Sequence, residues 1–351
     1  MFNIEYFKHL AKHISSFYPS FNESQFIAEI EQKIEPLSLN ERMRMGCQCL
    51  KKQLPKSEAQ TISIFDQVIP LMPKGYTNLI FPEYIALYHK DINSALDALA
   101  FYTCFGSSEF AVRHFLNLYW EQTFPFLIEW SKSPNEHLRR LASEASRPHL
   151  PWSMKLKNVA ENPNLTFEIL NQLKEDNSLY VKKSVANHLN DISKNQSEWL
   201  INKISKWNFK HPNTKWIIKH GLRTLIKKGN PDTLKFLGVE TKPIEVRKLN
   251  LFPKEIVKGD ALHFEVEIYN PYDDQMNVIV DYVIYYLKQN NKHNSKVFKW
   301  KTFELAPRSA IFLTKKQIFK DFSTRKHVEG MHYFQLQVNG QLYEKIDWTL
   351  L

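Results

Sequence analysis

One glutamate near the middle of the chain lies among arginines at helical spacing. Arg140 precedes Glu144 by four residues and Arg147 follows it by three, so all three side chains project from one side of a helix. Trp152 stands just beyond a Pro-His-Leu-Pro segment, where that helix must already have ended. Such a carboxylate can stabilise positive charge that develops on a sugar, and an indole on a loop can stack on a sugar or a cationic base.

The cations recur in a register that indicates an internal repeat. Each follows an aliphatic residue or alanine by two positions, at intervals of 27, 43 and 36 residues. These intervals bracket the lengths of HEAT or armadillo repeats, in which the second helix of each pair lines a concave face. We therefore expect a stripe that contacts phosphates, with solvated helix faces as the alternative. The cations are Arg113, Arg140, Lys183 and Lys219, and the residues four positions after them are Asn117, Glu144, Asn187 and Arg223.

The acidic residues in this register call for an explanation. Glu144 is the one negative charge among the residues that follow the cations, and a second carboxylate, Glu109, precedes Arg113 by four residues. Either glutamate could be part of a surface ion pair, which contributes little to stability, and spacing leaves this alternative open. A carboxylate on a surface that attracts phosphate weakens binding, which favours a catalytic reason for its presence. Trp216 is a second, weaker candidate for stacking.

The elements that must position these residues are short helices. Apolar residues recur every three or four positions up to about residue 238, and Ser38 with Glu41 forms a capping box. Proline marks further helix starts, because it loses no hydrogen bond in a first turn. These starts are at Pro134, Pro163, Pro212 and Pro231. Helices interrupted this often suit a HEAT-like α-solenoid over residues 1–238.

The pattern changes after Gly238 to the period of half-buried strands. Strands are predicted at residues 262–269, 278–287, 297–303, 310–314 and 333–338, with a polar loop at 288–296. Five or more strands without helices between them indicate an antiparallel β-sandwich of the immunoglobulin-like type over residues 239–351. The fold class is therefore multidomain, α and then β.

Composition limits the partners and the compartment. A formal charge of +10 over 351 residues favours a polyanion such as DNA. Three cysteines supply neither a disulfide framework nor a zinc site, and no signal peptide or apolar span is found. We expect a soluble cytoplasmic protein that needs no metal or cofactor. In a protein that binds DNA, a glutamate among cations suggests chemistry on a sugar–base bond.

Four segments together resemble a known family. They contain Ser108–Arg113, Arg139–Trp152, Tyr180–Asp191 and Lys215–Leu225, and they look like the AlkC branch of bacterial alkylation-repair DNA glycosylases, relatives of AlkD. The resemblance covers about residues 105–238. Ala145, His149 and His114 depart from the residues expected of the branch, which bears on fine geometry more than on activity. Some members of the branch carry an immunoglobulin-like domain at the C-terminus, in agreement with the strand pattern.

The resemblance implies excision of 3-methyladenine and 3-methylcytosine from duplex DNA, without a dedicated pocket for a flipped base. Glu109 and Glu144 would flank the deoxyribose, where they position water and counter positive charge, and Trp152 would pack against the sugar. Contacts with DNA are expected from Arg113, Arg140, Arg147, Lys183, Trp216, Lys219 and Arg223.

The second domain would close around the DNA through the loop at 288–296, Arg308 and Lys315–Lys316, unless these charges only keep a sandwich soluble. The main alternative function is a non-catalytic helical-repeat scaffold that binds nucleic acid or protein. An adhesion protein is disfavoured by the missing signal peptide and the scarce cysteines.

Overall fold

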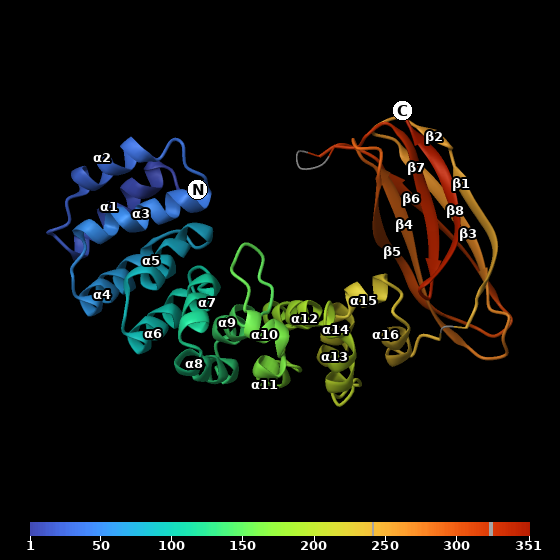
Figure 1. Ribbon diagram of the computed structural model, residues 1–351, viewed down its shortest axis with the longest axis horizontal. Coiled ribbons are helices and arrows are strands. Elements are labelled where there is room, and N and C mark those ends of the chain that lie inside the picture. Colours follow the sequence, from blue (N-terminus) through green and yellow to red (C-terminus); the bar gives the residue numbers. More distant parts are fainter. Residues whose placement is uncertain (241, 323–325) are drawn as a thin grey trace. The chain divides into compact units, whose positions relative to one another are not determined.

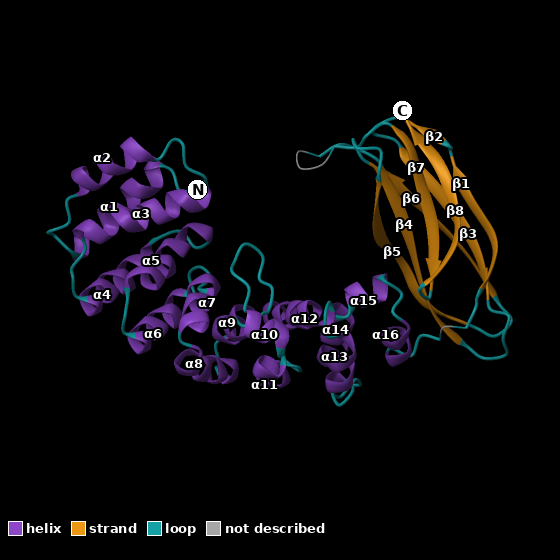
Figure 2. Ribbon diagram, viewed as in Figure 1, coloured by secondary structure: helices purple, strands orange, loops and turns teal. Residues whose placement is uncertain are grey.

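The computed structural model describes residues 1–240, 242–322 and 326–351, in which helices precede strands (Figure 1, Figure 2). Contacts divide the chain into two units. The first contains Met1–Ile192 and Trp207–Gly221, and the second contains Ser193–Lys206 and Leu222–Leu351. Among the described residues, no helix has both the length and the apolar character that crossing a membrane requires.

The first unit is a stack of short helices, in which helices close in sequence pack against each other (Figure 1). The α-helices are α1 (Ile4–Phe17), α2 (Glu23–Lys33), α3 (Leu39–Gln53), α4 (Glu58–Val68), α5 (Ile80–Tyr88), α6 (Ile92–Tyr102), α7 (Glu109–Leu118), α8 (Trp120–Lys132), α9 (Glu136–Ala145), α10 (Lys157–Glu161), α11 (Asn164–Gln172), α12 (Leu179–Ser193) and α14 (Pro212–Gly221). Each buries one apolar stripe against its neighbours, as Leu10 and Ile14 do in α1.

The predicted helix starts are confirmed. Pro163 is the N-cap of α11, and Pro212 is the first residue of α14. Pro134 precedes Asn135, the N-cap of α9, whose side chain accepts a hydrogen bond from the backbone N–H of His137 at 2.9 Å. Pro231 begins a helix of the second unit. Proline therefore fixes where these helices begin, and with them the position of α9.

The second unit is a β-sandwich with three helices at its N-terminal side in sequence. The elements are α13 (Ser197–Ile204), α15 (Arg223–Lys227), α16 (Pro231–Phe236), β1 (Glu245–Phe252), β2 (Glu255–Ile256), β3 (Ala261–Tyr269), β4 (Met276–Leu287), β5 (His293–Leu305), β6 (Ala310–Ile318), β7 (Gly330–Val338) and β8 (Gln341–Leu350). One sheet has the order β1-β3-β6 and the other β2-β8-β7-β4-β5. The inward residues of both sheets form one core, which includes Phe264, Tyr282 and Trp348.

The fold class is confirmed, with a few departures in detail. All five predicted strands lie within β3 to β7. The polar loop is shorter than predicted, because β5 already begins at His293. β1 and β8 were not predicted, and the short pairing of β2 with β8 is parallel, which makes this sheet mixed.

Helices α15 and α16 pack onto the sandwich. Leu234 and Val239 share a small core with Ile279 of β4, and the side chain of Gln337 donates a hydrogen bond to the carbonyl oxygen of Lys227 at 3.2 Å. These contacts group residues 222–238 with the strands. The domain boundary after residue 238, which rests on the change of sequence period, stays a prediction.

Candidate active site

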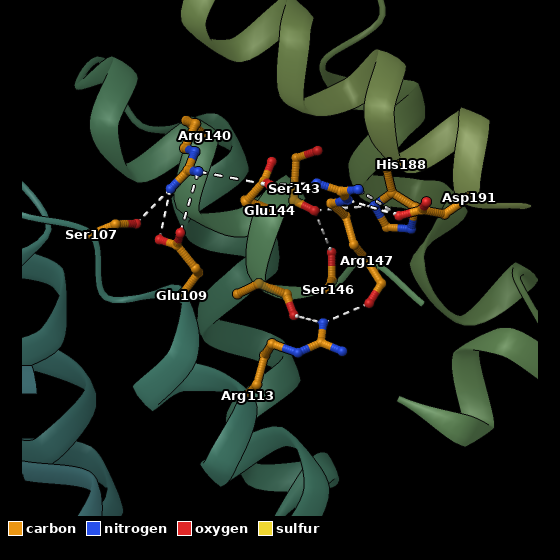
Figure 3. A network of polar contacts seen from close by, with 11 residues as sticks. Ser107, Glu109, Arg113, Arg140, Ser143, Glu144, Ser146, Arg147, His188 and Asp191 are labelled. Atoms are coloured by element: carbon orange, nitrogen blue, oxygen red, sulfur yellow. Dashed lines mark hydrogen bonds and ion pairs between the residues drawn. The ribbon is translucent and has the colours of Figure 1, made fainter. Parts of the chain in front are cut away.

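Two adjacent helices bring the two predicted glutamates to one guanidinium (Figure 3). Glu109 is the first residue of α7, where the helix dipole favours a negative charge. Arg140 of α9 reaches across and donates from Nη1 to Glu109 Oε2 at 2.8 Å, and its Nη2 lies 3.7 Å from Glu144 Oε1. Arg140 therefore holds both carboxylates at once.

Glu144 is held from its other side by a second ion pair. It lies in the last turn of α9, where the helix dipole disfavours a carboxylate. Arg147 compensates, because its Nη1 donates to Glu144 Oε1 at 2.6 Å while its Nε and Nη2 each lie 2.8 Å from Asp191 Oδ2. Asp191 is on α12, so three helices contribute to the network.

A buried histidine contacts the backbone next to Glu144. His188 of α12 places Nδ1 3.1 Å from the carbonyl oxygen of Ser143 and Nε2 3.2 Å from the hydroxyl of Thr166. A carbonyl can only accept, so Nδ1 carries the proton and Nε2 accepts from the threonine. Burial, with the nearby Arg147 cation, lowers the pKa of His188 to about 3. The ring is therefore neutral at physiological pH.

The two carboxylates differ in how many of their oxygens are held by arginines. Both oxygens of Glu109 accept from Arg140, at 2.8 and 3.4 Å. Both arginine contacts of Glu144 go to Oε1, and within the described part of the chain no hydrogen bond or ion pair reaches its Oε2. Glu144 therefore keeps an acceptor oxygen for a water molecule.

A cleft of about 480 Å³ lies beside Glu109. Trp152 lines it from the loop between α9 and α10 and is 84% exposed. The backbone φ of Trp152 is 63°, a left-handed conformation that costs free energy in a residue with a side chain. A strained and exposed indole at a cleft is typical of a binding surface rather than of a core. The predicted placement of Trp152 on a loop is confirmed.

Part of the cleft lining comes from two turns that pack through glycines. Gly75 adopts a φ of 137°, and its N–H donates to the carbonyl oxygen of Phe105 at 3.0 Å. A Cβ at Gly106 would lie 2.9 Å from the Gly75 oxygen, so a larger residue there would separate the turns. Lys74 Nζ lies 5.5 Å from the ring centre of Phe105, which places a cation at the rim.

Tyr180 joins the cleft to the ion pairs. Its ring lies 5.0 Å from the guanidinium carbon of Arg140 and packs edge-on against His137 at 5.8 Å between ring centres. Burial raises the pKa of the Tyr180 hydroxyl, which therefore stays protonated at neutral pH. Arg140 is thus fixed by a carboxylate on one side and an aromatic ring on the other.

Two of the predicted DNA contacts are buried. Arg113 is fully buried, and its guanidinium donates to backbone carbonyl oxygens instead of facing solvent. Arg147 is buried between Glu144 and Asp191. Spacing along a helix does not show which face another segment covers, and the contacts of both residues with DNA stay predictions. Arg140 is occupied by carboxylates, so its predicted role in orienting them has a geometric basis, while its contact with phosphate stays a prediction.

The remaining predicted DNA contacts lie elsewhere. Lys183 and Lys219 are exposed, and Arg223 is half-buried. Trp216 stacks on His220 with ring centres 4.8 Å apart, which covers one of its faces. Their contacts with DNA stay predictions.

Sequence reasoning missed several residues of the site. Asp191 and Tyr180 lie in one of the segments that carry the family resemblance, but nothing in their spacing indicated their partners, which are far away in sequence. Lys74 and Gly75 gave no signal beyond a glycine in a turn. Among the residues that the structure describes, no three His, Cys, Asp or Glu side chains come together as a metal site, and a metal-free reaction stays a prediction.

Comparison with known proteins places this geometry in a family. Residues 84–225 match the family model of the DNA alkylation repair enzyme, and residues 245–351 match that of "Uncharacterised protein YhaZ, C-terminal Ig-like domain". YhaZ of Bacillus subtilis (strain 168) is 37% identical over 353 residues, which cover 100% of this chain and 98% of YhaZ.

Among solved structures, Pseudomonas fluorescens alkylpurine DNA glycosylase AlkC bound to DNA containing an abasic site analog is 37% identical. It superposes with a TM-score of 0.94 and covers 100% of this chain and 98% of its own. A β-glucosidase from Listeria innocua matches over only 31% of the chain, with a TM-score of 0.26. The chain belongs to the AlkC family of DNA alkylation-repair glycosylases.

Proposed function

We propose that this chain hydrolyses the N-glycosidic bond of cationic alkylated bases, 3-methyladenine and 3-methylcytosine, in duplex DNA. The observation that carries the proposal is the pair of carboxylates on neighbouring helices, Glu109 and Glu144, held by the single guanidinium of Arg140. Glu109 and the exposed indole of Trp152 line one cleft. A purely structural ion pair would explain the arginine but not the exposed, strained tryptophan.

The chemistry follows from the charge of the lesion. A cationic base leaves without prior protonation, because the electron pair of the breaking C1′–N bond neutralises it. The sugar left behind is oxocarbenium-like, and fixed carboxylates stabilise it as they do in glycoside hydrolysis. Water then adds to C1′ and gives up one proton, which leaves an abasic sugar and a neutral base.

The two glutamates have different roles in this proposal. Glu144 Oε2 accepts a hydrogen bond from the attacking water and takes its proton, since its other oxygen is held by Arg140 and Arg147. Glu109 acts as a fixed negative charge beside the sugar, because Arg140 occupies both of its oxygens. Trp152 packs its ring on the deoxyribose, a contact of about 1–3 kcal/mol in nucleic-acid sites.

The buried charges of the site balance, which allows carboxylates to lie in a poorly solvated place. Three acidic side chains, Glu109, Glu144 and Asp191, interact with the guanidinium groups of Arg113, Arg140 and Arg147. Desolvated charges in fixed positions act more strongly than hydrated ones and need no reorganisation during the reaction. In this proposal no metal ion is required, and the damaged base stays in the duplex instead of entering a dedicated pocket.

The DNA partner is supported by the relative of known structure, since AlkC was solved bound to DNA containing an abasic site analog. We place the chain at the bacterial nucleoid in the cytoplasm, as a monomer.

In the sandwich, Arg308 pairs with Asp273, and Lys315 donates to the carbonyl oxygen of Lys299 at 3.1 Å. Lys316 is exposed and is the first cation to test for contact with DNA.

A panel of lesions tests the proposed substrate class. The protein is incubated with duplexes that carry 3-methyladenine, 3-methylcytosine or a neutral lesion such as uracil, and the released base is quantified by chromatography. We expect release of the two cationic bases only. Release of uracil at a similar rate would contradict the reasoning from leaving-group charge. Binding to every duplex without any release would instead support a non-catalytic scaffold.

A further inference from the structure

Within the described residues, the buried Arg113 guanidinium donates its hydrogen bonds to backbone carbonyl oxygens. Its Nη1 donates to the carbonyl oxygens of Ala145 and Arg147 at 2.9 and 2.5 Å. Its Nε donates to the carbonyl oxygen of Met154 at 3.0 Å, and its Nη2 donates to the same oxygen. A buried guanidinium must have its donors satisfied, and here backbone carbonyl oxygens satisfy them.

These carbonyl oxygens belong to the two limbs of one loop. The loop at residues 146–156 leaves α9, carries Trp152 and enters α10, and in Figure 1 it stands out between these helices. Its own backbone closes with few bonds, chiefly from the N–H of Leu156 to the oxygen of Pro148 at 3.3 Å. Arg113 ties the outgoing limb at 145–147 to the returning limb at Met154.

The same residue connects the loop to both carboxylates. Arg113 lies one helical turn after Glu109 on α7, and the carbonyl oxygen that it takes from Arg147 belongs to the residue that holds Glu144. Burial, with the nearby Arg147 cation, lowers the pKa of Arg113 to about 10, so the guanidinium remains charged at neutral pH.

We propose that Arg113 is a positioning residue that holds the Trp152 loop against the glutamates of α7 and α9. The inference rests on the proposed function of Trp152 as the surface for the deoxyribose. The donors of a guanidinium are spread over a planar fork, which lets one side chain bond three separate carbonyl oxygens. The donors of lysine share a single compact ammonium group, and methionine has no donor. Without Arg113 the indole is still present, but its place relative to Glu109 and Glu144 is no longer fixed.

A double-mutant cycle on the full chain separates positioning from simple stability. Single-turnover excision of 3-methyladenine is measured for Arg113→Met, Trp152→Ala and the double variant, with Arg113→Lys as the milder change should Arg113→Met not fold. Arg139→Met is the matched control, because Arg139 also bonds backbone oxygens, those of Ser133 and Pro134, but not the loop. Melting temperatures establish that each variant is folded.

We expect Arg113→Met and Trp152→Ala each to slow excision about 10- to 100-fold. The double variant should be within about twofold of Trp152→Ala alone, because both changes remove the same contact. The factors by which Arg139→Met and Trp152→Ala slow excision should instead multiply in their double variant. Independent, multiplicative losses for Arg113→Met would overturn the inference while leaving the role of Trp152 intact. A Trp152→Ala variant as fast as wild type would instead overturn the proposed role of Trp152, and the inference with it.

Hydrogen exchange gives a readout that does not depend on activity. Backbone amides of residues 148–156 should exchange faster in Arg113→Met than in wild type or Arg139→Met, while those of the middle of α9 stay protected. Unchanged exchange in the loop would show that Arg113 does not order it, and would overturn the inference even if the proposed function holds.

Discussion

Replacing Arg147 by methionine tests whether the site depends on compensated buried charges. Methionine keeps the unbranched apolar part of the side chain and removes the charged guanidinium. The side chains of Glu144 and Asp191 are only 8% and 3% exposed, and both lose a partner. Glu144 keeps Arg140 at 3.7 Å, and Asp191 loses its ion pair with Arg147.

The magnitude follows from burial. Leaving a buried charge without its partner costs about 3–5 kcal/mol. For a folded unit of this size each kcal/mol lowers the melting temperature by about 2–4 °C, so we expect a drop of roughly 6–20 °C. Adding Asp191→Asn removes one of the two buried negative charges that Arg147 pairs with and should recover about 1–3 kcal/mol of the loss.

Urea unfolding, followed by the circular dichroism of the helices, measures these free energies. Lys132→Met is the control, because its ion pair with Glu129 on α8 of the same unit is 51% and 72% exposed and should contribute little to stability. A loss for Arg147→Met no larger than that of the control, with no recovery on adding Asp191→Asn, would refute the view that these charges are coupled and buried.

Three further outcomes are expected. Arg140→Gln should slow single-turnover excision up to about 100-fold, since it frees Glu109; excision at the wild-type rate would contradict this. When the pH is lowered from 6.5 to about 3, the unfolding free energy of the wild type should fall by up to about 1.4 kcal/mol per pH unit. The reason is that the unfolded chain protonates His188 in this range while the folded chain does not. In urea titrations at several pH values, the unfolding free energy of His188→Gln should depend less on pH than that of the wild type. The same dependence in both proteins would argue against this role of His188. Gly106→Ala should destabilise by about 1–3 kcal/mol, since its Cβ would lie 2.9 Å from the Gly75 oxygen; an unchanged melting temperature would contradict that contact.

Local spacing predicted the part of the site that lies on one helix. Glu144 with Arg140 and Arg147 is an i,i+4 and i,i+3 arrangement, and all three side chains meet as expected. The contact from Arg140 to Glu109 spans 31 residues, and that from Arg147 to Asp191 spans 44. Such pairs depend on how helices pack, which spacing along one helix does not contain.

The burial of Arg113 was not predicted for a related reason. Its register correctly indicated a helix, but the face that carries Arg113 is covered by the loop at 146–156. In the sandwich, alternation found β3, whereas β1 and β8 bury few residues and show no clean period of two. Alternation identifies strands with one buried face and misses those that are mostly exposed.

The central claim is that Glu144 supplies the carboxylate on which hydrolysis depends. Glu144→Gln keeps the shape of the side chain and removes its charge, and Glu129→Gln, an exposed glutamate that pairs with Lys132, is the control. Release of free 3-methyladenine from a methylated duplex is measured under single-turnover conditions, together with DNA affinity. We predict that Glu144→Gln abolishes release while affinity stays similar or rises, and that the control excises as wild type does. Release by Glu144→Gln at the wild-type rate would contradict the account.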